Sequence, residues 1–470
     1  MRVLHIGWGF YPWRAGGLIE YTESLMKKQV QQGYKVAYFC SGRIYPFIKK
    51  TSIKKWKKNN YEIFEIINPT IYHGGDEGTL FDIESETIEK LFQKVLFQFK
   101  PNVIHIQELA GLPSSLIDII YNNNIPCVMT LHDYFLLCPT LKLLDYNYQN
   151  CLEYHIENKC PNCIKSTPNN NKKLLMIKTL HHDFKPLINI LPNSIKNFFR
   201  EIFLTLRKNF LYKNQNTPKK TVIENNENYF QKRREINIER LKKIDLLIAQ
   251  SKRLEEIYKH FVPNLSIKTV NSPAEHIEKI KPKHINCKIP VKFGTLNGMA
   301  SIQKGAYLLL DTINILQKLQ DKFELHIFGA ILPTAYEKIK NYKNIFYHGK
   351  YKIEELNNIL ENINVGIIPS IWEEAYGYVG LEFLSKGIPI ISNNKGGITE
   401  YTIENLTGWV NKSSSAQELA QIMENIINNP EIVNELNQKI IKNRDKIIKT
   451  MDQHLQEIHQ VYTELINNKK

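Results

Sequence analysis

The sequence predicts an α/β fold with two Rossmann-like domains, each built on a parallel sheet that helices cover. Short β-type runs alternate with helical patterns in both halves of the chain, as parallel sheets require. This alternation occurs twice, on either side of a middle segment of different composition. A length of 470 residues is enough for two or three domains with buried cores. The two sheets are expected to face each other across a cleft that binds the ligand.

The first half of the chain gives an N-terminal domain, residues 1–275. The segment 18–33 follows a glycine loop and has the pattern of a helix. Apolar β-type runs predict strands at 2–7, 35–40, 102–107, 126–132 and 243–251.

The second half repeats the scheme and gives a C-terminal domain, residues 276–450. Pro273, Pro282 and Pro290 place the linker near residues 271–290, because proline interrupts regular structure. Expected strands lie at 291–296, 324–329, 344–349, 365–370 and 389–392, and expected helices at 305–319, 353–361 and 377–386. Residues 451–470 are predicted to form a helix that returns to the N-terminal domain.

The middle segment, at about 139–240, is expected to be an insertion in the N-terminal domain. Within it, residues 194–212 have an apolar helical face opposite a basic one. Such a helix can lie on an anionic membrane surface or pack on a protein core, and the sequence leaves both open.

Four cysteines of this insertion have the donor set of a closed structural zinc site. Cys138, Cys151, Cys160 and Cys163 end in a tight C-x2-C pair, while the other spacings are loose. Free buried thiols are the alternative.

The charge balance favours an anionic partner. The chain has a formal net charge of +15 and a pI near 9.2, which suits nucleic acid, an acidic membrane surface or a phosphorylated ligand. It contains no apolar run of the roughly 18–20 residues that a membrane span needs and no signal-peptide pattern. We therefore expect a cytoplasmic location, where cysteines stay reduced.

Residues 373–386, EEAYGYVGLEFLSK, place carboxylates around the entrance of a helix. If the helix begins near Gly377, backbone N–H groups of Gly377, Tyr378 and Val379 point at an anion such as phosphate. Glu374 and Glu382 would repel a phosphate but can accept hydrogen bonds from hydroxyl groups on either side of it. A nucleotide sugar has this layout of ribose, diphosphate and hexose.

The segment 369–400 resembles the donor-site signature of retaining glycosyltransferases of family 4, which have the GT-B fold. The resemblance implies that Glu374 holds the transferred sugar and that Glu382 holds the ribose. The backbone of Gly377, Tyr378 and Val379 would then bind the phosphates.

Three further segments are similar to the same family. The Gly16-Gly17 loop is expected to border the reaction centre, which places both glycines among the donor-binding residues. His132 is expected to line the active site, and Lys304 to bind the diphosphate. Many relatives carry an arginine five or six positions before this lysine, where the present chain has Gly298 and Met299.

The resemblance to bacterial cell-surface polysaccharide glycosyltransferases implies a function. It is sugar transfer, with retained anomeric configuration, from a UDP- or GDP-sugar to a glycan or lipid-linked acceptor. His132, Lys304 and Glu374 are the expected catalytic residues, and no cofactor is expected to be needed for catalysis. The enzyme is expected at the inner membrane face as a peripheral protein, and no nucleic-acid partner is expected. A nucleotide-sugar epimerase of GT-B architecture and a degenerate, non-catalytic partner subunit are the alternatives.

Overall fold

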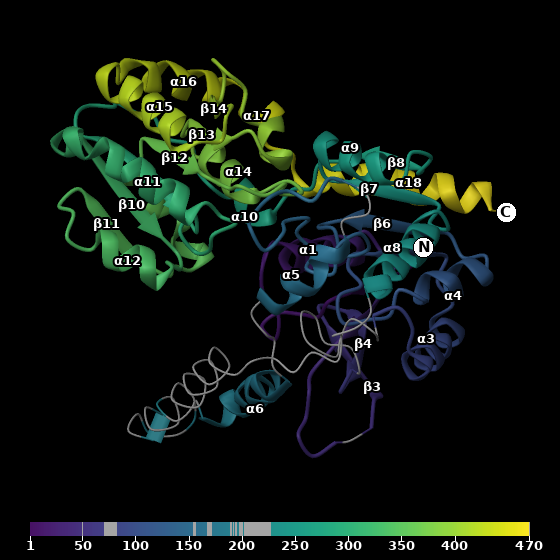
Figure 1. Cartoon of the computed structure of the whole chain (residues 1–470). Coiled ribbons are helices and arrows are strands. Elements are labelled where there is room, and N and C mark those ends of the chain that lie inside the picture. The colour runs from purple at the N-terminus through teal and green to yellow at the C-terminus, as the bar shows by residue number, and fades with distance from the viewer. Residues whose placement is uncertain are drawn as a thin grey trace. The chain divides into compact units, whose positions relative to one another are not determined.

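The computed structural model describes residues 1–48, 50–69, 82–153, 157–166, 172–188 and 227–469, with residues 190, 192, 195–196 and 201. The basic helix expected at 194–212 therefore lies almost entirely outside the described residues. The chain forms two compact units (Figure 1). The N-terminal unit comprises Met1–Ile248, Tyr258–Lys268 and Leu455–Lys470, and the C-terminal unit comprises Ala249–Ile257 and Thr269–His454.

The N-terminal unit is built on an eight-stranded sheet of order β3-β4-β2-β1-β5-β6-β7-β8. Its strands are β1 (Arg2–Gly7), β2 (Lys35–Ser41), β3 (Ser52–Lys58), β4 (Tyr61–Ile67), β5 (Val103–Ile106), β6 (Cys127–Leu131), β7 (Leu246–Ala249) and β8 (Ile267–Thr269). Strand β1 pairs in parallel with β2 and β5, in a register that sets His5 beside His105. The five strands expected in this half are all present.

One edge of this sheet departs from the expected parallel arrangement. Strands β3 and β4 form an antiparallel hairpin. Its turn residues Asn59 and Asn60 have φ values of +46° and +65°, a left-handed conformation that asparagine tolerates and that closes two-residue hairpins. The Asn-Asn pair between two β-type runs was a usable sequence signal for this hairpin.

Helices flank the sheet because each has one apolar face. In α1, the side chains of Ile19, Leu25 and Met26 are buried against the sheet. The helices are α1 (Gly17–Gln31), α3 (Glu86–Phe99), α4 (Leu116–Asn122), α5 (Cys160–Ser166), α6 (Lys172–Ile188), α8 (Glu227–Leu241), α9 (Lys252–Phe261) and α18 (Met451–Asn468).

The C-terminal unit has a six-stranded parallel sheet of order β11-β10-β9-β12-β13-β14. Its strands are β9 (Val291–Leu296), β10 (Phe323–Phe328), β11 (Ile345–Gly349), β12 (Val365–Ile368), β13 (Ile390–Asn393) and β14 (Gly408–Asn411). Its helices are α10 (Glu275–Glu278), α11 (Ala306–Leu316), α12 (Pro333–Ile339), α13 (Leu356–Ile359), α14 (Tyr378–Ser385), α15 (Ala416–Asn428), α16 (Glu431–Lys442) and α17 (Arg444–Ile447). Apolar clusters pack α11 and α15 on one face of the sheet and α14 on the other.

The helix expected at 353–361 is wrong in its regularity. The segment consists of a 3-10 turn at Ile353–Glu355, the four-residue α13 and a second 3-10 turn at Leu360–Asn362. Adjacent asparagines, Asn357 and Asn358, have low helix propensity. Among the described residues, no helix combines the length and the apolar character that crossing a membrane requires.

Candidate functional site

Helix α14 presents an N-terminus that no side chain of the described residues caps. It starts after Gly377, whose φ of +79° suits glycine because other residues adopt it only with strain. The Tyr401 hydroxyl donates to the Gly377 carbonyl and thereby supports this turn. An uncapped helix N-terminus with its dipole is a natural anion site, and Tyr378 and Val379 begin this helix.

Lys304 and Glu374 meet at the same site. Lys304 Nζ lies 2.8 Å from Glu374 Oε1, and the lysine side chain is 35% exposed while the glutamate is 9% exposed. The Glu374 Oε2 atom lies 3.2 Å from the position that a Cβ on Gly377 would take. The predicted diphosphate ligand and the predicted sugar ligand are thus direct neighbours, beside the start of α14.

Glu382 lies inside α14 and is almost fully buried. Its Oε1 atom accepts a hydrogen bond from His276 Nε2 at 2.8 Å. Its Oε2 atom is buried and has no hydrogen-bond partner within the described part of the chain. A buried carboxylate oxygen without a partner is costly, so a hydroxyl donor from a ligand would satisfy it.

Tyr401 connects the two glutamates. Burial raises the pKa of its hydroxyl well above the ordinary value, and the charges of Glu374 and Glu382 raise it further. Both carboxylates therefore lie close to one phenol, so the C-terminal unit brings Lys304, Glu374 and Glu382 together around the start of α14.

Glu373, next to Glu374, has a structural role that the sequence did not indicate. Its carboxylate is 3% exposed and pairs with Arg253 Nε and Nη2, each at 3.1 Å. It also accepts a 2.7 Å hydrogen bond from the Gly396 N–H. The Gly397 N–H donates to the Glu374 carbonyl at 2.8 Å. These bonds hold the loop that carries Glu374 against the Gly396-Gly397 turn.

Two glycines explain the surroundings of Lys304. Gly305 has a φ of +92°, and a Cβ there would lie 1.9 Å from the Pro369 carbonyl oxygen. At Gly298 a Cβ would lie 2.1 Å from Thr295 Oγ1, and Met299 is fully buried. The positions at which family relatives carry an arginine therefore have no room for a long polar side chain.

The N-terminal unit holds the other predicted site residues. Gly16 has a φ of +126° and precedes α1, whose N-terminus receives no cap from a described side chain; Gly17 is the first residue of this helix. His132 follows β6, and its ring lies 5.1 Å from that of Tyr21 on α1. Burial lowers the pKa of His132 to about 3, so its imidazole is neutral at pH 7.

Two carboxyl groups beside His132 were not anticipated, although Asp133 adjoins it in the sequence. Glu108 follows β5 and Asp133 follows β6, and their side chains are hydrogen-bonded to each other. Burial and then the Asp133 charge raise the pKa of Glu108 well above its usual range, and burial raises the pKa of Asp133. Glu108 Oε1 accepts from the Leu109 and Ala110 N–H groups at 2.7 and 2.9 Å. The pair shares a proton.

We predict that Glu108→Gln stabilises the protein at alkaline pH. The folded pair retains a proton that the unfolded chain loses above about pH 4.3, so wild-type stability falls as pH rises from there toward the raised pKa. A neutral glutamine keeps the hydrogen bonds without needing that proton. The free energy of unfolding should rise by about 1–3 kcal/mol at pH 8 and change little at pH 4. Thermal melts at both pH values test this, with exposed Glu354→Gln as the control. An equal pH dependence in variant and wild type would contradict it.

The four cysteines gather in one region of the N-terminal unit. Burial raises the pKa of Cys151 to about 12 and that of Cys163 to about 11, and the charge of Cys138 adds to both effects. Cys160 is affected in the same way. However, no group of three or more His, Cys, Asp or Glu side chains in the described ranges is arranged to hold a metal ion. The thiols are neighbours, but this structure does not place them as a ligand set.

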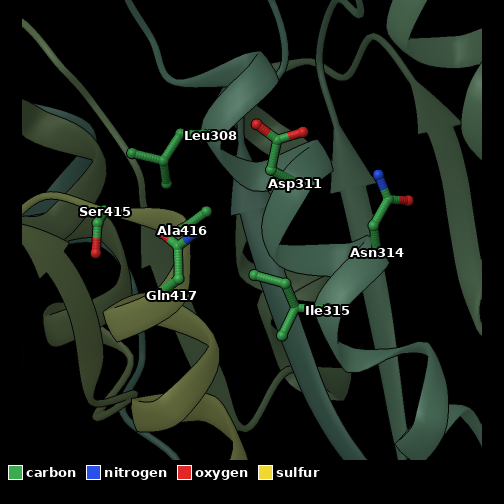
Figure 2. Close-up of a pocket in the computed structure, with 7 residues that line it drawn as sticks. All are labelled: Leu308, Asp311, Asn314, Ile315, Ser415, Ala416 and Gln417. Carbon is green, nitrogen blue, oxygen red and sulfur yellow. The ribbon is translucent and has the colours of Figure 1, made fainter.

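A hollow of about 520 Å³ lies away from these residues, between α11 and α15 (Figure 2). Its lining consists of Leu308, Asp311, Asn314, Ile315, Ser415, Ala416 and Gln417. None of the predicted site residues lines it.

Comparison with known proteins agrees with the geometry. Residues 296–446 match the family described as glycosyl transferases group 1. An uncharacterized 41.2 kDa protein of the cps region of Klebsiella pneumoniae is 30% identical over 151 residues, 32% of this chain and 41% of that protein. The amylovoran biosynthesis glycosyltransferase AmsK of Erwinia amylovora is 26% identical over 211 residues, 41% of this chain and 51% of that protein. The matched stretches thus cover about half or less of these relatives.

A solved structure matches the whole fold. HepE from Anabaena, in complex with UDP and glucose, has a TM-score of 0.57 at 12% identity, over 98% of this chain and 99% of that one. The two α/β units therefore have the GT-B fold, as the sequence predicted. All the donor-site residues of the C-terminal unit described above lie within the family match, apart from His276 and Arg253. The chain carries a domain of the glycosyl transferase group 1 family at residues 296–446.

Proposed function

We propose that the protein is a retaining glycosyltransferase. It transfers a sugar from a nucleotide diphosphate sugar to a hydroxyl group of a glycan or lipid-linked acceptor in cell-surface polysaccharide biosynthesis. The observation that carries this proposal is the grouping of Lys304, Glu374 and the unsatisfied Oε2 atom of Glu382 around the uncapped start of α14. This set matches a diphosphate flanked by two sugars. The relatives from the cps region and from amylovoran biosynthesis support the pathway class.

In the proposed reaction, each group of the C-terminal unit has a separate task. The start of α14 and Lys304 bind the diphosphate and stabilise its charge as it leaves. Glu382 accepts ribose hydroxyls, and Glu374 accepts hydroxyls of the transferred sugar. Attack on the face that the diphosphate leaves retains the anomeric configuration, and a diphosphate oxygen takes the proton of the acceptor hydroxyl. His132 binds a hydroxyl or a phosphate as a neutral imidazole.

A UDP-sugar is the first donor to test, since HepE binds UDP; a GDP-sugar is the other candidate. Each can be screened by the rise in melting temperature that a bound ligand causes. Release of nucleotide diphosphate together with a glycosylated product would establish transfer. Rearranged free nucleotide sugar from a donor-only incubation would instead indicate an epimerase. Failure of every donor to bind would favour a non-catalytic subunit.

The zinc site remains a proposal that rests on cysteine spacing and on the proximity of the thiols. Zinc would lower the raised pKa values of Cys151 and Cys163 by binding their thiolates, and would draw the four sulfurs together. It would serve the fold of the N-terminal unit and take no part in the transfer step.

We predict about one zinc per chain by elemental analysis, as a four-thiolate site requires. Chelation should then lower the melting temperature, because metal-binding energy contributes to folding. Cys287→Ser, which changes a cysteine in the C-terminal unit, should leave the zinc content unchanged. Metal-free protein whose melting is insensitive to chelators would exclude the site.

A further inference from the structure

A chain of buried polar side chains begins at His132. His132 Nε2 lies 3.2 Å from Gln107 Oε1, and Gln107 Nε2 lies 3.2 Å from His5 Nδ1. His5 Nε2 in turn lies 2.7 Å from Gln29 Oε1. His5, Gln29 and Gln107 are at most 1% exposed, so these groups depend on one another for hydrogen bonds.

The chain continues to the C-terminal helix α18. Gln29 Nε2 donates to the Tyr462 hydroxyl at 3.2 Å, and that hydroxyl lies 2.6 Å from His105 Nδ1. His105 Nε2 lies 2.7 Å from Thr130 Oγ1. Every one of these residues belongs to the N-terminal unit.

The donors and acceptors fit in one direction when the histidines are neutral. Because Tyr462 accepts from Gln29, its single proton goes to His105 Nδ1, and His105 therefore carries its own proton on Nε2. Burial lowers the pKa of His5 to about 4, so His5 is neutral at pH 7. It donates through Nε2 to Gln29 and accepts through Nδ1 from the Gln107 amide.

This order determines the tautomer of His132. With its amide nitrogen turned to His5, Gln107 offers only its oxygen to His132, which must donate through Nε2. The lone pair of the neutral His132 imidazole is then on Nδ1.

We propose that this chain fixes His132 as its Nε2-protonated tautomer, and that Tyr462 is a positioning residue for sugar transfer because it sets the direction of the chain. The inference rests on the proposed function, in which His132 contacts substrate and offers it an acceptor rather than a donor at Nδ1. A helix more than 300 residues away in the sequence thereby controls a hydrogen-bonding property of the site.

Tyr462→Phe tests the proposal. Without the hydroxyl, Gln29 and His105 lose their partners, and the chain can reverse. The ¹⁵N shifts of the His132 ring, assigned by comparison with His132→Gln, should change from one tautomer to a mixture. The kcat for transfer should fall by about 2- to 12-fold, as expected for one hydrogen bond, with little change in donor KM. Tyr34→Phe is the matched control, since Tyr34 also bonds α18, through His459, but lies outside the chain.

Each outcome decides the inference. A tautomer mixture with reduced kcat, absent in Tyr34→Phe, supports it. An unchanged tautomer overturns it, as does a mixture with unaltered kcat. If Tyr462→Phe does not fold, Gln29→Met breaks the same chain at another link and is judged by the same two readouts. Wild-type protein that has the single tautomer but transfers no sugar would refute the proposed function and not the hydrogen-bond chain.

Discussion

Glu374→Gln is expected to reduce kcat for sugar transfer by about 100-fold or more, with a smaller effect on donor KM. In the proposed site, Glu374 lies beside the transferred sugar, where positive charge develops as the diphosphate leaves. Its contact then strengthens in the transition state, so losing its charge slows the chemical step. The change also removes the ionic partner of Lys304, 2.8 Å away.

Glu382→Gln should act differently, because the ribose contacts do not change during the reaction. The loss of charge-assisted hydrogen bonds should raise donor KM by about 10- to 150-fold and leave kcat nearly constant. Exposed Glu354→Gln is the isosteric control for both variants. Steady-state kinetics at varied donor concentration separate the two effects. Equal losses in kcat for Glu374→Gln and Glu382→Gln would refute the assignment of the two glutamates to different ends of the donor.

Glu373→Gln was expected from the sequence to have little effect, and the structure argues otherwise. Glutamine can still accept from the Gly396 N–H but gives up the paired contact with Arg253. Its effect should therefore appear as reduced stability of the loop, which melting without ligand distinguishes from a direct effect on catalysis.

The largest effect on stability is expected for Gly396→Ala. Gly396 has a φ of +58°, and a Cβ there would lie 2.3 Å from both the backbone nitrogen and the carbonyl oxygen of Glu374. Neither of these backbone atoms can move without displacing the loop that carries the site glutamates. We expect a loss of more than about 3 kcal/mol in the free energy of unfolding, from left-handed strain together with overpacking.

Gly349→Ala is the matched control for that prediction. Gly349 lies in the same unit and has a φ of +77°, but no atom of the described residues lies within 4 Å of the position that a Cβ would take there. It should cost only the strain, about 1–2 kcal/mol. Denaturant unfolding of both variants separates strain from collision, and equal losses would show that the contact with Glu374 is not what constrains Gly396.

Local sequence patterns determined the architecture. The period-two apolar runs and the helical runs that follow them predicted every strand of the central sheets except β3, β4, β8 and β14, because such patterns record which face of each element is buried. The helix start at Gly377 and the eight-residue step from Glu374 to Glu382 were also legible, since both lie within one loop and one helix. The regular helix expected at 353–361 failed because weak local propensity left the outcome to packing.

The tertiary structure alone decided which polar groups meet. Arg253 reaches Glu373 across 120 positions, and His276 reaches Glu382 across 106. Tyr462 joins His105 across 357 positions. Nothing in the sequence near either partner specifies such a pair, because the two side chains become neighbours only when the sheet and its helices are assembled. The cysteines show the same limit, since their spacing suggested a metal site while the positions of their sulfurs depend on how the chain folds around them.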